Sequence, residues 1–283
     1  MKTRWLKRLE VVGLVLIISG INLSFTLFGN SRYESQISTL QNTVASLQKE
    51  ISQQADLTNV SVSDTAITVS DIADKVIPSV VGIEVSAKVT YNYGPFGTRT
   101  ELQSSSGSGI VYSADGYIIT NYHVVEAYAV NSTGGSLKVI TSDGTQYTAT
   151  YVGGNQASDL AVLKVNATNL TPAVFDLSTS YKAGDFTMAV GYPLGMDLAS
   201  SVTVGVISGV DRNISSDVTS EGLIQTDASI NPGNSGGALV DAQGEVIGIT
   251  NAKIATTSVE GIGFAIPIDY AMPLIQQIIN SAK

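Results

Sequence analysis

The sequence predicts an all-β protein of two six-stranded antiparallel β-barrels with a C-terminal helix, preceded by a transmembrane helix and a helical stalk. The barrels are predicted from the chain after Asp71, where short β-branched runs alternate with Gly, Asn, Asp and Ser at intervals of roughly ten residues. These runs fall into two sets of six, separated by residues 176–184. The transmembrane helix is predicted from a long uncharged stretch near the N-terminus.

Residues 1–30 are expected to form a basic flank and a membrane anchor. The run 11–29 is uncharged and rich in Val, Leu, Ile and Phe, and as a helix it would be about 28 Å long. A cleaved signal peptide is the alternative, but residues 27–30 offer no small-residue cleavage site. The basic residues Lys2, Arg4, Lys7 and Arg8 predict a cytoplasmic N-terminus. We therefore expect a single-pass protein of a bacterial cytoplasmic membrane, in contact with the lipid bilayer through residues 11–29 and with the rest of the chain outside.

Residues 31–58 are expected to form a helical stalk, because 32–57 contain neither Gly nor Pro. Apolar residues recur there at spacings of three and four, as at heptad positions a and d: Ile37, Leu40, Val44, Leu47 and Ile51. This pattern covers only about two heptads, so a solvated amphipathic helix and a short coiled coil both remain open. Residues 59–70, rich in Ser, Thr, Val and Asp, are expected to be a linker.

The strand-rich region spans 71–283. The first barrel is expected over about 78–178, with strands Val80–Val85, Ser108–Ser113, Tyr117–Thr120, Leu137–Thr141, Gln146–Val152 and Leu160–Val165. The second is expected over about 183–268, with strands Phe186–Gly191, Ser201–Ser208, Gly222–Asp227, Gly237–Val240, Val246–Ala252 and Gly261–Ile266. Segment 91–106 is expected to be a functional or mobile loop. Helical turns are expected at 71–76, and a closing amphipathic helix at 268–279, with Pro273 suggesting its true start.

Composition excludes several classes of function. The chain has no Cys and a single His, which excludes disulfides, thiol nucleophiles and Cys-containing zinc sites. No Asp/Glu cluster at ligand spacing is visible, so neither a metal site nor a cofactor is expected. The formal net charge of -9 argues against nucleic acid as a partner. With 283 residues and 43% hydrophobic content, the chain can bury a sizeable core.

A serine in a glycine-rich loop is the candidate nucleophile. In Gly233-Asn234-Ser235-Gly236-Gly237 the glycines can adopt positive φ, which lets successive backbone N–H groups point at one spot. Ser235 would attack a carbonyl carbon, and the N–H groups of Gly233, Asn234 and Ser235 would form the oxyanion hole. An ordinary Gly-rich turn between two strands is the alternative for this pentapeptide.

Ser235 needs a base, and His123 is the only imidazole in the chain. His123 is expected at a strand end, entering a turn. Asp159 stands just before an apolar strand, where its carboxylate would receive the imidazole N–H; capping a turn is its alternative role. The order His, Asp, Ser is that of chymotrypsin-type double barrels. It predicts that the first barrel supplies the base and the carboxylate and the second supplies the nucleophile.

With these residues in place, the chain resembles the HtrA/Deg family of trypsin-like serine proteases. The stretches that carry the resemblance most specifically are Thr120–Val125, Ser158–Val165 and Ile224–Leu239. The resemblance implies a double barrel that hydrolyses peptide bonds without a cofactor. It also implies misfolded or regulatory extracytoplasmic proteins as substrates, a role in protein quality control under stress, and a homotrimer. Family members commonly carry C-terminal PDZ domains, so we expect either a protease-only member or a truncated sequence.

Four residues are candidates for the primary specificity pocket: Ile230, Thr250, Asn251 and Ala252. No charged residue lies between Ala228 and Asn234, which disfavours a preference for basic side chains, and Ala252 suits a small apolar side chain. The family resemblance likewise implies cleavage after small aliphatic residues.

Three functions compete on this sequence. A serine endopeptidase acting on polypeptides leads, because all three triad positions are filled. A latent or inactive holdase or scaffold that binds unfolded polypeptides is the alternative. An esterase using the same three residues would require the double-barrel prediction to be wrong.

Overall fold

The computed structural model describes residues 44–45, 67–192, 200–214, 222–253 and 261–282. The chain divides into two compact units, 1–66 and 67–283, and the fold below is that of the second. The expected anchor at 11–29 lies outside the described residues, as does the expected stalk apart from positions 44 and 45. Within the described ranges, no helix has the length and apolar character that a bilayer span requires.

A short helix leads into the first barrel. Helix α3 (Val69–Val76) begins at a capping box, in which Thr68 and Asp71 each accept a hydrogen bond from the other's backbone N–H. A 3₁₀ turn, η1 (Ile77–Ser79), contains Pro78 and carries the chain into the first strand. The helix therefore starts two residues before the predicted turns at 71–76. Its buried face packs into the hydrophobic cluster that the two barrels share.

The first barrel is closed and antiparallel, with strand order β1-β2-β3-β6-β5-β4. Its strands are β1 (Val80–Asn92), β2 (Thr98–Val111), β3 (Tyr117–Thr120), β4 (Ser136–Ile140), β5 (Gln146–Asn155) and β6 (Leu160–Val165). Side chains that alternate along these strands fill the interior, among them Ile83, Ile118 and Leu163. One helix, α4 (Tyr122–Val130), follows β3 and packs on β1 and β2. The six predicted strands of this barrel are confirmed, whereas α4 was not foreseen.

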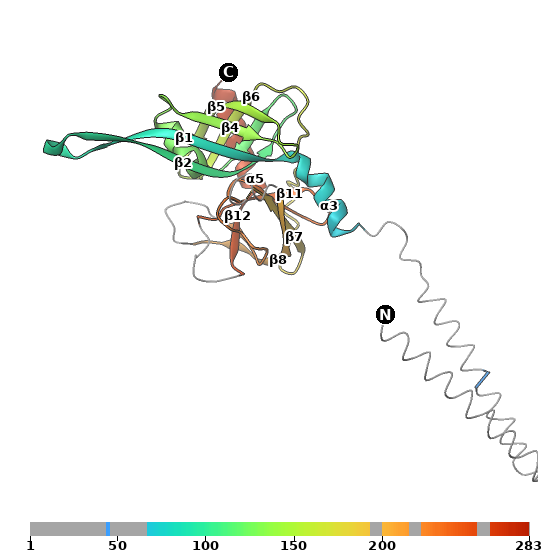
Figure 1. The fold of residues 1–283 in the computed structure, drawn as a ribbon. Coiled ribbons are helices and arrows are strands. Elements are labelled where there is room, and N and C mark those ends of the chain that lie inside the picture. Colours follow the sequence, from blue (N-terminus) through green and yellow to red (C-terminus); the bar gives the residue numbers. More distant parts are fainter. Residues whose placement is uncertain (1–43, 46–66, 193–199, 215–221, 254–260, 283) are drawn as a thin grey trace, which may run out of the picture. The chain divides into compact units, whose positions relative to one another are not determined.

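The second barrel is also closed and antiparallel, with strand order β10-β11-β12-β9-β8-β7. Its strands are β7 (Phe186–Gly191), β8 (Ser201–Arg212), β9 (Leu223–Thr226), β10 (Ala238–Val240), β11 (Val246–Thr250) and β12 (Gly263–Pro267). A separate apolar cluster that includes Ile224, Leu239 and Ile247 fills it. Figure 1 shows the two barrels one above the other, which confirms the predicted pair of six-stranded barrels.

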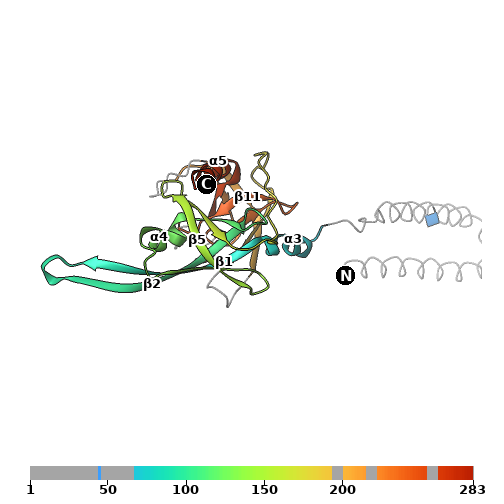
Figure 2. The same cartoon turned by 90° about the horizontal axis from the view of Figure 1, so that it is seen from above.

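The segment 91–106 is not an irregular loop as expected. It belongs to a long hairpin in which β1 and β2 pair without a break from Val80↔Ile110 to Asn92↔Thr98, joined by η2 (Gly94–Phe96). Thr, Val and Tyr recur near the tip, and these residues favour extended backbone. Figures 1 and 2 show the end of this hairpin projecting away from the barrels.

Helix α5 (Ile268–Ser281) closes the chain and packs on β5, β6, β11 and β12. It begins at Ile268, so the suggestion that Pro273 marks its start is wrong, and Pro273 lies inside the helix. Pro273 is the sixth residue of the helix, so it lacks the N–H that would donate to the Asp269 carbonyl one turn back, and the helix continues past it without that bond. The helix contacts both barrels and so joins them on this side.

Candidate active site

His123 and Asp159 are brought together where α4 begins and β6 begins. His123 Nδ1 lies 2.7 Å from Asp159 Oδ2, and the His123 N–H donates to Asp159 Oδ1 over 2.8 Å. A carboxylate facing Nδ1 holds the proton on that nitrogen, which leaves Nε2 as the basic atom. His123 occupies the first turn of α4 rather than a turn after a strand, because the helix starts directly after Asn121.

Asp159 is almost completely buried, at 2% exposure, and is held by several donors. Its backbone takes a left-handed conformation, with φ 53°, which Asp tolerates better than most residues. The Asn251 side-chain amide donates to Asp159 Oδ2 over 2.8 Å, and the Asn121 amide donates to the Asp159 backbone oxygen over 3.0 Å. These donors fix the Asp159 carboxyl group in position facing the imidazole of His123.

Ser235 lies in the loop between β9 and β10, on the second barrel as predicted, and is 4% exposed. Gly236 in this loop has φ +83°, and a Cβ added there would lie 2.3 Å from two oxygens of the first barrel, Ser108 O and Thr120 Oγ1. Only glycine fits this close approach. The Ser235 Oγ accepts a hydrogen bond of 3.1 Å from the Ala252 N–H. Among the described residues, no hydrogen bond joins Ser235 Oγ to His123.

Two backbone donors beside Ser235 are free. Within the described part of the chain, neither the Gly233 N–H nor the Ser235 N–H donates a hydrogen bond. The Asn234 N–H is different, since it donates to the Asn231 oxygen over 2.9 Å. The prediction that Asn234 contributes its N–H to the oxyanion hole is therefore wrong, and Gly233 and Ser235 remain as the candidate donors.

A buried serine that the sequence did not single out links the two barrels at this loop. Ser108, on β2, donates from Oγ to the Gly233 oxygen over 2.6 Å and accepts from the Tyr192 N–H over 2.8 Å. Its own N–H donates to the Ser235 oxygen over 2.8 Å. Ser108 thus fixes one side of Gly233, which carries one of the two free donors.

The four predicted pocket residues separate into two groups. Ile230 and Ala252 belong to one apolar cluster of the second barrel, as a pocket wall requires. Thr250 is fully buried and donates from Oγ1 to the Asn234 oxygen, so it supports the nucleophile loop. Asn251 is also fully buried and points to Asp159. The assignment of these two residues to the pocket is wrong, because both side chains turn into the protein.

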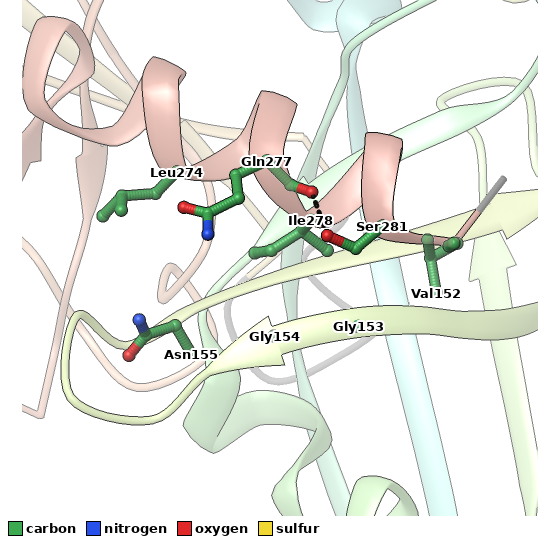
Figure 3. Close-up of a pocket in the computed structure, with 9 residues that line it drawn as sticks. Val152, Gly153, Gly154, Asn155, Leu274, Gln277, Ile278 and Ser281 are labelled. Carbon is green, nitrogen blue, oxygen red and sulfur yellow. Dashed lines mark hydrogen bonds between the residues drawn. The ribbon is translucent and has the colours of Figure 1, made fainter.

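A groove elsewhere on the protein contains no triad residue. It lies between β5 and α5, with a volume of about 320 Å³, and Figure 3 shows Gly153 and Gly154 facing Ile278. A Cβ on Gly153 would lie 2.9 Å from an Ile278 methyl carbon, so the glycine permits the close packing of α5 on β5. One wall residue, Asn155, accepts the Ser158 N–H and so shapes the turn that carries Asp159.

Comparison with known proteins gives consistent relatives. Residues 107–249 match the trypsin-like peptidase domain family. The chain is 39% identical to Serine protease Do-like HtrA of Bacillus subtilis (strain 168), over 78% of this chain and 51% of that protein. It is 36% identical to Serine protease Do-like HtrA of Lactococcus lactis subsp. cremoris (strain MG1363), over 96% and 70% respectively. The chain thus spans about half the length of the Bacillus relative.

A solved structure of the HtrA-type protease AlgW with decapeptide superposes with a TM-score of 0.64 at 35% identity, covering 76% of this chain and 68% of that one. Fold and sequence therefore agree on the same group of relatives.

Proposed function

Because the chain belongs to the trypsin-like peptidase family, together with the HtrA serine proteases, we propose that it is a serine endopeptidase. One arrangement carries the proposal. His123 pairs with Asp159, and the adjacent residues Asn251 and Ala252 donate to Asp159 and to Ser235 Oγ, so they connect this pair to the serine. The loop of that serine offers two free backbone N–H groups. An acyl-transfer site needs these parts, namely a nucleophile, an oriented base and donors for the oxyanion.

The reaction follows from these positions. His123 Nε2 takes the Ser235 hydroxyl proton as Oγ attacks the peptide carbonyl, and Asp159 stabilises the imidazolium that forms. The carbonyl oxygen becomes negative and accepts from Gly233 and Ser235 N–H. His123 then protonates the leaving amine, and water hydrolyses the acyl-enzyme by the same route. For this proton transfer Ser235 Oγ would have to leave the Ala252 N–H and bond to His123, and χ1 is the one side-chain torsion that moves Oγ.

Cleavage after small aliphatic residues fits the walls of the proposed pocket. Ile230 and Ala252 are apolar, and Ala228 beside them is fully buried. Within the described residues, these three walls supply only apolar side chains, which would strip a Lys or Arg side chain of its hydration without pairing its charge.

The setting of this activity is part of the same proposal. The uncharged run 11–29 behind a basic flank supports a single-pass anchor in the bacterial cytoplasmic membrane, with the protease domain outside. Misfolded or regulatory extracytoplasmic proteins would be the substrates. The apolar heptad positions 37–51 support association of stalks into a homotrimer.

Digestion of unfolded casein by the full chain in detergent micelles tests the activity. Wild-type protein should release fragments with small aliphatic residues at their new C-termini, read by mass spectrometry. Ser235→Ala should lose at least about a thousandfold in rate, because the nucleophile is removed while the fold is kept. Equal cleavage by both proteins would contradict the assignment of Ser235.

A holdase or scaffold is the second candidate, favoured by one observation: Ser235 Oγ bonds to the Ala252 N–H rather than to His123. Labelling with a fluorophosphonate, which reacts only with an activated serine, separates the two functions. Wild-type protein that binds casein but neither cleaves it nor takes up the label would support the holdase.

A further inference from the structure

Strand β2 runs directly past the nucleophile. The Ser108 N–H donates to the Ser235 oxygen, as one strand residue donates to a neighbouring strand. A Cβ on Gly107 would lie 2.7 Å from both Val124 methyl carbons and 3.2 Å from the Ser235 oxygen. The Ser105 hydroxyl donates to the Val124 oxygen over 2.9 Å. Val124 follows His123, so this part of β2 lies against the base as well as the nucleophile.

The outer edge of β2 carries unused main-chain groups. Successive residues of an antiparallel strand point their N–H and C=O groups to opposite edges. Ser108 points both groups away from β1, since its N–H bonds Ser235 and its C=O accepts from Thr120 Oγ1. The register with β1 has no shift as far as the tip. Every second residue counted back from Ser108 therefore also points its N–H and C=O away from β1. None of these main-chain groups bonds another described residue; they belong to Ser106, Ser104, Leu102, Thr100 and Thr98.

This edge lacks two of the features that normally protect exposed strands, a proline and a bulge, and its charged side chains Arg99 and Glu101 pair with each other. Proteins block such edges with prolines, bulges or inward charges, because an open edge pairs with other chains. Residues 98–106 contain no Pro and no bulge, and the serines at 104–106 leave room for an added strand. The projecting part is a two-stranded ribbon, which is only marginally stable in water, and Leu102 is 65% exposed on it. A third strand would stabilise the ribbon.

We propose that the outer edge of β2, from Thr98 to Ser106, binds the leaving-group side of a polypeptide substrate as an added β-strand. The inference rests on the proposed peptidase function. The leaving amine takes its proton from His123, so this side of the substrate departs on the flank that β2 and Val124 form. Ala252 stands on the other flank of Ser235, beside the acyl side. The edge is about 26 Å long, which matches about eight residues of extended chain.

The test compares peptides that share one acyl half and carry two, four, six or eight residues after the scissile bond, using the full chain in detergent. Wild-type kcat/KM should rise with each added pair, by about two- to tenfold for each main-chain hydrogen bond gained. Leu102→Pro and Ser104→Pro remove an outward N–H without touching the ladder to β1, so both should flatten the rise. The matched controls Leu102→Ala and Ser104→Ala keep the N–H and should retain it.

Two further measurements keep the outcomes distinct. A peptide anilide with no residues after the scissile bond should be hydrolysed equally by all five proteins; failure of wild type to hydrolyse it would overturn the peptidase function itself. N-methylation of the eight-residue peptide should lower kcat/KM at alternate positions only, a readout on wild type that needs no variant. A kcat/KM that does not depend on peptide length, or methylation effects that do not alternate along the peptide, would overturn the proposal that the β2 edge binds substrate. A sedimentation coefficient lowered by Leu102→Pro, without any length dependence, would assign the edge to a second copy instead.

Discussion

Ser108→Ala tests whether a buried hydroxyl on the first barrel holds the oxyanion loop of the second. The change removes Oγ, which donates to the Gly233 oxygen over 2.6 Å and accepts from the Tyr192 N–H over 2.8 Å. Ser108 is 0% exposed, so water cannot readily replace either bond. Both partners would be left unpaired, and Gly233 would lose the contact that fixes one of its sides.

The magnitude follows from these two bonds. Each of the two buried partners left without a hydrogen bond costs about 1–3 kcal/mol, so the free energy of unfolding should fall by about 2–6 kcal/mol. For a folded unit of this size, at about 3 °C for each kcal/mol, that lowers Tm by roughly 6–18 °C. If the Gly233 N–H also turns away from the position of the oxyanion, one oxyanion donor is lost, and kcat should fall by up to about 100- to 1,000-fold.

The assay pairs thermal unfolding with hydrolysis of a short peptide anilide, for the full chain in detergent. Ser106→Ala is the control, because Ser106 lies on the same strand with the same parity but is exposed. Its Tm and kcat should stay close to wild type. If Ser108→Ala lowers Tm but leaves kcat unchanged, Ser108 is only a packing residue and the reasoning about Gly233 is refuted.

Substitutions at three other positions, Asn251, Gly236 and Tyr181, also have expected outcomes. Asn251→Ala removes the amide that donates to Asp159 and should lower kcat/KM about tenfold; Asn251→Asp, which sets a like charge beside Asp159, should lower it further. The opposite order in steady-state kinetics would contradict a positioning role for the amide. Gly236→Ala should cost about 3–5 kcal/mol in denaturant unfolding, because its Cβ meets two oxygens at positive φ. Gly184→Ala, also at positive φ but in open space, should cost about 1–2 kcal/mol, and equal costs would refute the steric argument. Burial and nearby carboxylates raise the pKa of Tyr181 to about 12. Between about pH 10 and 12 the folded state therefore holds a proton that the unfolded state has lost, so stability should fall as pH rises. The fall should be shallower in Tyr181→Phe, and identical slopes would speak against this tyrosine.

Much of the fold was predictable because short sequence patterns indicate most of its strands. Runs of β-branched residues between turn residues mark strands directly, and their division into two sets of six predicted both barrels. Elements that depend on context were missed. Helix α4 has few features of an independent helix and forms where the chain turns away from β3 toward Asp159. The polar ribbon at the end of β1 and β2 lacks an apolar face, so no periodic signal distinguished it from a loop.

The sequence by itself determined the chemistry that this chain can carry. A single imidazole, no thiol and one serine in a loop of glycines left one arrangement for covalent catalysis, because each role needs a particular side-chain type. Only the tertiary structure decided which supporting group forms a hydrogen bond with which residue of the candidate site. Asn251 meets Asp159 across 92 residues and Ser108 meets Gly233 across 125, while the Asn234 N–H is taken by a local turn. Buried polar groups must find partners, but the closure of the barrels determines which partners they meet, and no local spacing records it.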